Sequence, residues 1–289
     1  MPDRIGVIDL LVGLPRTPDD TGWRAALAPL LRDEESRTTY KGPAQHLFKD
    51  RPSEQLDDEA VTAVLREMDR WGVERAMVQV ELADDDIGRG AVRDHPNRFF
   101  GAFGVDPNGG TASLRALRRA VAEIGVKAAT VFPAGTFPQV AIDDPLMYPV
   151  YAACVDLDLP ICVNAGVPGP RLPATTQDVM RFDQVCYDFP DLRIVMRHGA
   201  EPWAALAVKL MLKWPNLHYS TSAFAPRYYP ADVVQFANTR GADQVMYAGY
   251  FPMGLSLERI MSELPAVPFR DHVWPKFLRD NALRVFKLD

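Results

Sequence analysis

Residues 193–203, RIVMRHGAEPW, join a short apolar run to a glycine turn and the start of a helical pattern. Ile194, Val195 and Met196 are consecutive large apolar residues, which is typical of a strand buried on both faces. His198 and Gly199 follow this run, and residues 201–214 then read as a helix. The order of strand, turn and helix predicts one unit of a parallel α/β fold.

Seven other segments have the same apolar, β-branched character. The eight predicted strands cover residues 4–11, 75–80, 99–105, 128–132, 160–164, 193–197, 217–221 and 244–247. Helices are predicted over residues 57–72, 113–125, 145–157, 175–189 and 201–214. This alternation favours a (β/α)8 TIM-type barrel that forms a single domain over residues 1–289. The rival fold, a doubly wound sheet, lacks its usual signals, because no strand is followed by GxGxxG or GxxxxGK[ST].

Two segments do not follow the repeat. Residues 15–51 mix proline, charge and aromatic residues, and we interpret them as an insertion after strand one, over the active face. It is either a lid that brings Tyr40, Lys41 and His46 to the site or a surface excursion without a catalytic role. Residues 270–289 are predicted to form a C-terminal helix that closes the barrel or forms a homodimer.

Composition narrows the class of partner. Hydrophobic residues make up 47% of the 289 residues and charged residues 24%, as in ordinary globular proteins. The net charge of −6 disfavours binding to nucleic acid or to anionic lipid. Cys154, Cys162 and Cys186 have no CxxC spacing and are interpreted as core residues. Because no signal peptide or membrane-spanning pattern is found, we expect a cytoplasmic protein with a small-molecule substrate.

Polar residues at the carboxyl ends of barrel strands are the candidates for chemistry, because these ends face the substrate. His198, after the sixth strand, is the first candidate for general acid–base catalysis. Asn164 and Tyr250, at the ends of the fifth and eighth strands, could donate hydrogen bonds, and Arg197 could bind a carboxylate. As alternatives, Arg197 could point out of the barrel, while Asn164 and Tyr250 could satisfy backbone groups or fill space.

Three further residues are candidate substrate contacts. Asp9 ends the first strand, His46 lies in the insertion, and Arg171 lies in the loop PGPRLP after the fifth strand. For Asp9 the alternative is a buried, hydrogen-bonded structural residue, and for Arg171 it is an ordinary solvated charge.

Six short motifs occur in a fixed order along nearly the whole chain. They are IDL (8–10), FGAFGVDP (100–107), LPICVNAG (159–166), IVMRHGAEPW (194–203), YAGYFP (247–252) and RDNALRVF (279–286). This ordered set resembles the amidohydrolase-related family, which includes decarboxylases of the aminocarboxymuconate semialdehyde type. The resemblance implies a distorted barrel with decarboxylase or hydrolase activity. It also implies that His198 corresponds to the family's sixth-strand histidine, a proton donor or acceptor.

The family's metal-ligand positions hold other residues in this chain. Leu11 and Gly13 stand where the family has a His-x-His pair, Asn164 stands where a histidine ends the fifth strand, and Tyr250 replaces an aspartate. A zinc or manganese site needs three or four His, Cys or carboxylate donors. We therefore expect no metal and no other cofactor.

Together these features predict a metal-independent hydrolase or carbon–carbon lyase, decarboxylase-like, that acts on a small carboxylated or cyclic substrate through His198. The alternative is a catalytically inactive barrel with a binding or assembly role, because relaxed selection would also remove the four ligands.

Overall fold

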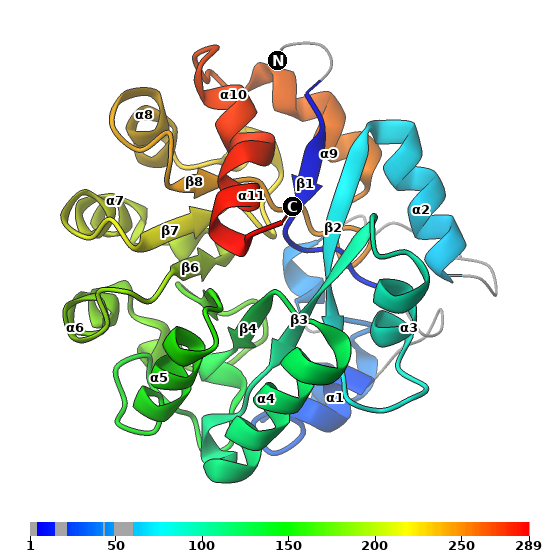
Figure 1. Ribbon diagram of the computed structural model, residues 1–289, viewed down its shortest axis with the longest axis vertical. Helices are drawn as coiled ribbons and strands as arrows, with labels where there is room; N and C mark the ends of the chain where they lie inside the picture. Colours follow the sequence, from blue (N-terminus) through cyan, green and yellow to red (C-terminus); the bar gives the residue numbers. More distant parts are fainter. Residues whose placement is uncertain (1–4, 15–21, 43, 49–59, 289) are drawn as a thin grey trace.

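The computed structural model describes residues 5–14, 22–42, 44–48 and 60–288, and its core is a curled sheet of parallel strands surrounded by helices (Figure 1). The eight strands are hydrogen-bonded in the order β1-β2-β3-β4-β5-β6-β7-β8. They are β1 (Val7–Asp9), β2 (Val73–Val80), β3 (Phe99–Gly104), β4 (Ala128–Val131), β5 (Ile161–Asn164), β6 (Ile194–Arg197), β7 (Leu217–Ser220) and β8 (Val245–Met246). Each overlaps one predicted run, and the predicted TIM-type barrel is confirmed.

The helices lie around the outside of the sheet (Figure 1). They are α1 (Gly22–Leu27), α2 (Ala60–Trp71), α3 (Ile87–Asp94), α4 (Thr111–Ile124), α5 (Tyr148–Asp156), α6 (Phe182–Asp188), α7 (Ala204–Lys213), α8 (Ala231–Thr239), α9 (Leu257–Glu263), α10 (Val273–Pro275) and α11 (Asn281–Phe286). On α2 the predicted apolar stripe buries Val64 and Met68, although residues 57–59 of that prediction lie outside the described ranges. None of the described helices is long and apolar enough to cross a membrane.

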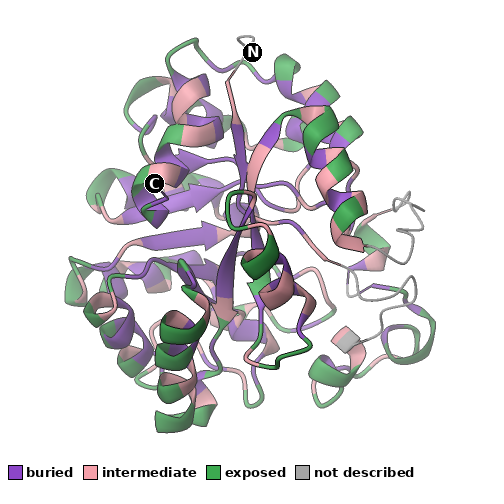
Figure 2. Ribbon diagram, turned by 45° about the vertical axis from the view of Figure 1, so that its right-hand side comes forward, coloured by how far each residue is buried: buried purple, intermediate pink, exposed green. Residues whose placement is uncertain are grey.

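Strand side chains alternate between the barrel interior and the surrounding helices, and the strands are almost wholly buried (Figure 2). The inner layer contains Ile8, Leu10, Met77, Phe100, Ala102, Ala128, Cys162, Val195, Met246 and Ala248. Helix α11 adds Ala282, Val285 and Phe286 to the same cluster. The rings of Phe286 and Phe100 lie 6.0 Å apart at the start of β3, so α11 packs against the amino-terminal end of the barrel.

The barrel has a seam between β1 and β8. In the described part of the chain these strands meet through one isolated bridge, Val12 to Phe251, where Gly13 N–H donates to the Phe251 carbonyl at 2.8 Å. Neighbouring strands elsewhere form ladders of two to five residue pairs. Backbone hydrogen bonds therefore hold the barrel together least at this seam.

The insertion after β1 has short helical turns in its described residues, 22–42 and 44–48. These are α1, a π-helical turn (Glu35–Thr39) and a 3-10 turn (Gln45–Leu47). Residues 15–21, 43 and 49–51 of the predicted insertion lie outside the described ranges. The three cysteines are free and buried, which confirms them as core residues.

Helix α3 was not predicted, because its sequence IGRGAVRD carries two glycines, which disfavour helix. Packing explains one of them. A Cβ at Gly88 would lie 2.0 Å from the Gln79 backbone carbonyl oxygen, so only glycine lets α3 approach β2 this closely. At Gly90 the nearest atom to such a Cβ is the flexible end of Arg93, at 4.0 Å.

This contrast gives a matched pair of variants. Gly88→Ala is expected to lower the free energy of unfolding by roughly 1 to 3 kcal/mol, because helix and strand must move apart. Gly90→Ala is expected to raise it by up to about 1 kcal/mol, because alanine favours helix and meets open space. Urea titration of both variants measures this difference, and equal effects would contradict the packing argument.

Candidate active site

A cavity of about 930 Å³ lies at the carboxyl ends of the strands. Asn164 of β5, His198 after β6 and Tyr250 after β8 contribute to it from the barrel. Aromatic side chains from the loops form much of the wall, and they are Trp23, Phe48, Phe132, Phe224 and Tyr228. All three residues predicted to be catalytic therefore border one cavity.

His198 is held in an uncommon backbone conformation. His198, Gly199 and Ala200 have φ values of 63°, 76° and 54°, and two of them are not glycine. A run in the left-handed region persists only where the surroundings enforce it, and such strain often occurs at functional sites. The His198 N–H donates to Ser222 Oγ at 2.9 Å, and His198 Nδ1 lies 3.1 Å from the same oxygen.

The electrostatic surroundings keep His198 neutral. Burial lowers its pKa to about 3, and the neighbouring positive charge of Arg197 acts in the same direction. The ring of Tyr250 meets the imidazole edge-on, with 6.0 Å between the ring centres. At neutral pH the cavity therefore presents an uncharged imidazole.

Arg197 points into the barrel. The β5–β6 register pairs Asn164 with Arg197 and Cys162 with Val195, and the latter two side chains belong to the inner cluster. Residues two positions along a strand share a face, so Asn164 and Arg197 also face inward, which excludes the outward alternative for Arg197. Arg197 Nε is buried without a hydrogen-bond partner among the described residues, and burial lowers the pKa of the guanidinium.

Tyr250 forms an aromatic wall that the sequence did not predict. Its ring stacks on Phe48 of the insertion, with 5.4 Å between the centres, and stands edge-on to His198. The contact brings a residue after β1 against one after β8, over the seam described above.

Asp9 lies outside the cavity. It is fully buried in the layer between strands and helices, where its Oδ1 accepts from Leu11 N–H at 2.9 Å and from Gly249 N–H at 2.8 Å. Its Oδ2 accepts from the Tyr247 hydroxyl at 3.2 Å. The structure therefore supports the structural alternative for Asp9: its carboxylate joins β1 to the end of β8 where backbone pairing is sparse.

Burial raises the pKa of Asp9 to about 6, against the opposing effect of its hydrogen bonds. The folded state therefore binds this proton more tightly than the unfolded state, and the contribution of Asp9 to stability falls as pH rises from about 4 to about 6.

Asp9→Asn should remove this cost. An asparagine can accept from Leu11 and Gly249 through Oδ1 and donate to the Tyr247 hydroxyl oxygen through Nδ2, so the contact with Tyr247 reverses its direction, the tyrosine hydrogen loses its acceptor, and no buried charge remains. We expect the free energy of unfolding at pH 8 to rise by up to about 3 kcal/mol, the equivalent of the pKa shift. Asp9→Ala, which leaves two buried N–H groups without acceptors, should instead lower it by roughly 2 to 5 kcal/mol. Urea titrations at pH 8 test both, and a destabilised Asp9→Asn would contradict this account.

Arg171 and His46 are not among the residues that line the cavity. Arg171 forms ion pairs of 2.8 Å with both Asp33 and Glu35, and its guanidinium lies 5.1 Å from the centre of the Tyr40 ring. His46 stacks on the ring of Tyr40, with 5.9 Å between the ring centres. The contacts of Arg171 fasten the insertion to the loop after β5, whereas the stack of His46 on Tyr40 lies within the insertion.

Two arginines that the sequence analysis did not select do line the cavity. Arg227 follows β7 and Arg259 lies on α9. Glu263 forms ion pairs with both arginines, and its Oε1 lies 3.1 Å from Arg259 Nε and 3.8 Å from Arg227 Nε. No carboxylate side chain is among the described lining residues, so this side of the cavity carries net positive charge. The fold brings these two arginines together, and no sequence pattern predicts their meeting.

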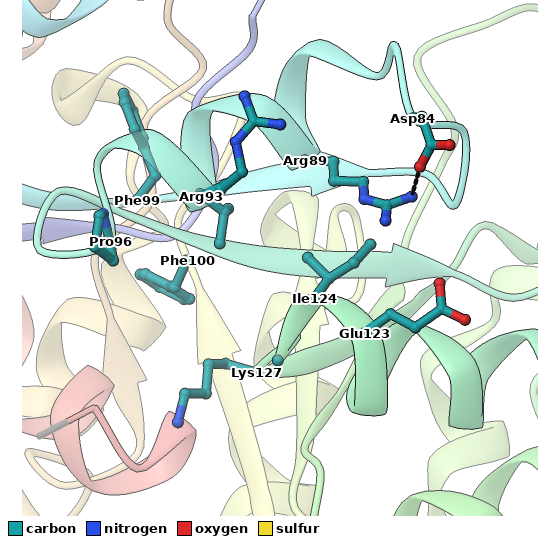
Figure 3. Close-up of a pocket in the computed structure, with 11 residues that line it drawn as sticks. Asp84, Arg89, Arg93, Pro96, Phe99, Phe100, Glu123, Ile124 and Lys127 are labelled. Atoms are coloured by element: carbon teal, nitrogen blue, oxygen red, sulfur yellow. Dashed lines mark ion pairs between the residues drawn. The ribbon is translucent and has the colours of Figure 1, made fainter.

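A second cavity, of about 610 Å³, lies outside the barrel between α3, the end of α4 and β3 (Figure 3). Its two arginines are engaged with neighbours: Arg89 pairs with Asp84 at 2.8 Å, as Figure 3 shows, and Arg93 pairs with Asp94 at 2.7 Å. Arg89 and Lys127 lie at different ends of this cavity and do not converge on one point (Figure 3). The cavity at the strand ends is therefore the candidate active site.

A closed parallel barrel with a cavity at the carboxyl ends of its strands has the architecture of TIM-barrel enzymes. The profile of the amidohydrolase family matches residues 17–288, and the chain belongs to that family. The search of curated protein sequences found no match.

Solved structures with the same fold share little sequence with this chain. An uncharacterised TIM-barrel protein from Bordetella bronchiseptica has a TM-score of 0.75 at 22% identity, covering 98% of each chain. A 5-carboxyvanillate decarboxylase from Sphingomonas paucimobilis has a TM-score of 0.70 at 17% identity, covering 99% of this chain and 100% of its own. A 4-oxalomesaconate hydratase from Rhodopseudomonas palustris has a TM-score of 0.63 at 16% identity, covering 97% and 95%.

The donor chemistry of the cavity does not fit the metal that the resemblance implies. A Cβ at Gly13 would lie 2.9 Å from the Met253 side chain, so this position has no room for a histidine as packed here. Leu11 offers no donor, and the Tyr250 ring packs between Phe48 and His198. Across the described ranges, no three His, Cys, Asp or Glu side chains gather closely enough to hold a metal ion.

Proposed function

We propose that the protein is a metal-independent carbon–carbon lyase of the decarboxylase type, with His198 as general acid or base and a small planar carboxylic acid as substrate. The composition of the cavity carries the proposal. It combines an imidazole and inward-facing polar groups with aromatic walls, and no carboxylate is among its described lining residues. A planar anion fits such a cavity, because aromatic faces contact its ring while arginines attract its charge.

The polar groups divide the reaction between them. Asn164 lines the cavity and can donate a hydrogen bond to a carboxylate, whereas Arg197, its neighbour on β6, is not among the described lining residues and contributes through its positive charge. In decarboxylation the bond from the substrate carbon to the carboxylate breaks, CO2 leaves, and the electron pair remains on the carbon, which takes up one proton that solvent water supplies. His198 is the one histidine among the described lining residues and is the group that assists this proton transfer.

The open cavity bears on the alternative of a catalytically inactive barrel. Loss of metal ligands without replacement of function would allow apolar side chains to fill the site, whereas about 930 Å³ remains with polar groups around it. This volume favours a protein that binds a small molecule. Catalysis and binding alone are then separated by experiment.

The test is a panel of benzoic and hydroxybenzoic acids incubated with chelator-treated protein, with CO2 release and thermal stabilisation both measured. We expect CO2 release that added Mn²⁺ or Zn²⁺ does not increase. Turnover only after metal is added would overturn metal independence. Thermal stabilisation without CO2 release would favour the binding role.

The proposal also includes two expectations about the protein in its cell. A cytoplasmic location and a homodimer follow from the sequence arguments given above. Light scattering of the eluted protein tests the second, and the mass of a single chain would contradict it.

A further inference from the structure

The two hydrogen bonds between Ser222 and His198 determine which imidazole nitrogen carries the proton. Ser222 is fully buried, and its hydroxyl has one hydrogen and two lone pairs. One lone pair accepts the His198 backbone N–H at 2.9 Å. The hydroxyl also lies 3.1 Å from His198 Nδ1, and the structure gives its hydrogen no other described acceptor.

Only one assignment of hydrogens satisfies both groups. If the Ser222 hydroxyl donates to Nδ1, every polar hydrogen has a partner. If Nδ1–H donated instead, the serine hydrogen would be buried without an acceptor, which costs roughly 1 to 3 kcal/mol. In the neutral imidazole a lone pair on Nδ1 requires the proton to be on Nε2.

We propose that Ser222 is a positioning residue that fixes His198 as the Nε2–H tautomer, so that the resting site presents a hydrogen-bond donor, not a proton acceptor, to a substrate oxygen. This deepens the proposed function and rests on it for the contact with substrate. Nε2 forms no hydrogen bond with the described residues. It is not one of the buried side-chain nitrogens without a partner, and His198 lines the cavity, so Nε2 is open to the cavity.

The role of this donor follows from the charge in the reaction. When CO2 leaves a planar acid, negative charge spreads onto oxygens conjugated with the ring carbon. A neutral N–H aimed at such an oxygen stabilises this charge as a hydrogen-bond donor, which narrows the proposed acid–base role of His198 to the acid side. Burial and the charge of Arg197 keep the imidazole neutral, which is the form this role requires.

The Ser222–His198 pair is not a nucleophilic dyad. A nucleophilic serine must reach the substrate, whereas Ser222 has no exposed surface and directs its oxygen at the His198 backbone. The pair therefore acts through the imidazole.

Long-range ¹H–¹⁵N NMR of histidine-labelled protein at pH 7.5 tests the assignment, with the His198 signals identified by their loss in His198→Asn. We expect the pattern of a neutral Nε2–H imidazole in the wild type. In Ser222→Ala we expect that pattern to change to a mixture of tautomers, and kcat to fall about tenfold.

Ser220→Ala is the matched control. Ser220 is also buried, two residues earlier on β7, and its hydroxyl donates to the Met196 carbonyl at 3.1 Å instead of to His198. This variant should lose similar stability but keep the wild-type His198 pattern.

An Nδ1–H tautomer or an imidazolium in the wild type would overturn the proposal, and so would an unchanged pattern in Ser222→Ala. The wild-type spectrum decides even if Ser222→Ala does not fold. It is also independent of turnover, so absence of CO2 release would count against the proposed function and leave the tautomer assignment standing.

Discussion

His198→Asn is expected to lower kcat for the decarboxylated acid by about 10²- to 10⁴-fold, the usual contribution of a positioned acid or base. Asparagine is polar and smaller than histidine, so it fits the space beside Ser222, but it cannot exchange a proton at neutral pH. KM should change much less, because Arg227, Arg259 and the aromatic walls remain in place. Steady-state CO2 release at several substrate concentrations separates the two constants.

His218→Asn is the control for this experiment. His218 is a buried histidine whose pKa, like that of His198, is lowered to about 3, but it lies on β7 near Arg284 of α11 and does not line the cavity. It should retain kcat within a few-fold. If both variants lose activity equally, the loss reports on barrel integrity and His198 has no catalytic role.

Acidification should destabilise the fold through the same two histidines. Both have folded-state pKa values near 3, lowered first by burial, against about 6.5 in the unfolded chain. Below pH 6.5 the unfolded state takes up protons that the folded state does not, so stability is lost as pH falls from about 6.5 towards 3. Each histidine costs about 1.4 kcal/mol per pH unit, or about 5 kcal/mol for the pair at pH 4.5.

Asp9 opposes this loss only in part. Its raised pKa gives the folded state about 2 kcal/mol on going from pH 6 to pH 4.5, so the three groups together should destabilise the protein by about 3 kcal/mol. That is a large fraction of the stability of an ordinary domain.

Urea titrations at pH 7.5, 5.5 and 4.5 measure this slope. His218→Leu should remove about half of the histidine contribution, and the His198→Asn, His218→Leu double variant should be no less stable at pH 4.5 than at pH 7.5. His272→Leu, at an exposed position, controls for the removal of any histidine. An unchanged slope in the double variant would assign acid sensitivity to other groups.

The fold could be predicted because its signal is local. Runs such as residues 194–196 predict a buried strand from their own apolar residues. The apolar stripe on α2 is likewise predicted by the spacing of residues within that helix. Helix α3 was missed because Gly88 serves a contact with Gln79, a cause that no helix propensity contains. The N-cap of α3 is a residue type that the sequence alone marks as a helix start, because Asp86 accepts from Arg89 N–H at 2.8 Å through its side chain.

The site was predictable only where one strand end supplies the residue. Asn164, His198 and Tyr250 were placed at the cavity by their strands alone. Arg227 lies in a loop and Arg259 on a helix, so no strand end predicts them. The role of Ser222 depends on the turn that brings the His198 N–H to its hydroxyl. Conversely, Arg171 was predicted as a substrate contact because its ion pairs with Asp33 and Glu35 depend on how two distant loops meet, which the sequence does not show.

The sparse seam between β1 and β8 also sets an order of events during synthesis on the ribosome. Strand β1 leaves the ribosome first and can pair with β2 early, but the groups that bond Asp9 from the other side, Tyr247 and Gly249, emerge much later. Until they and α11 arrive, one edge of β1 stays unpaired and the amino end of the barrel stays uncovered. The nascent chain therefore carries an exposed strand edge through most of translation, which is the kind of surface that chaperones bind.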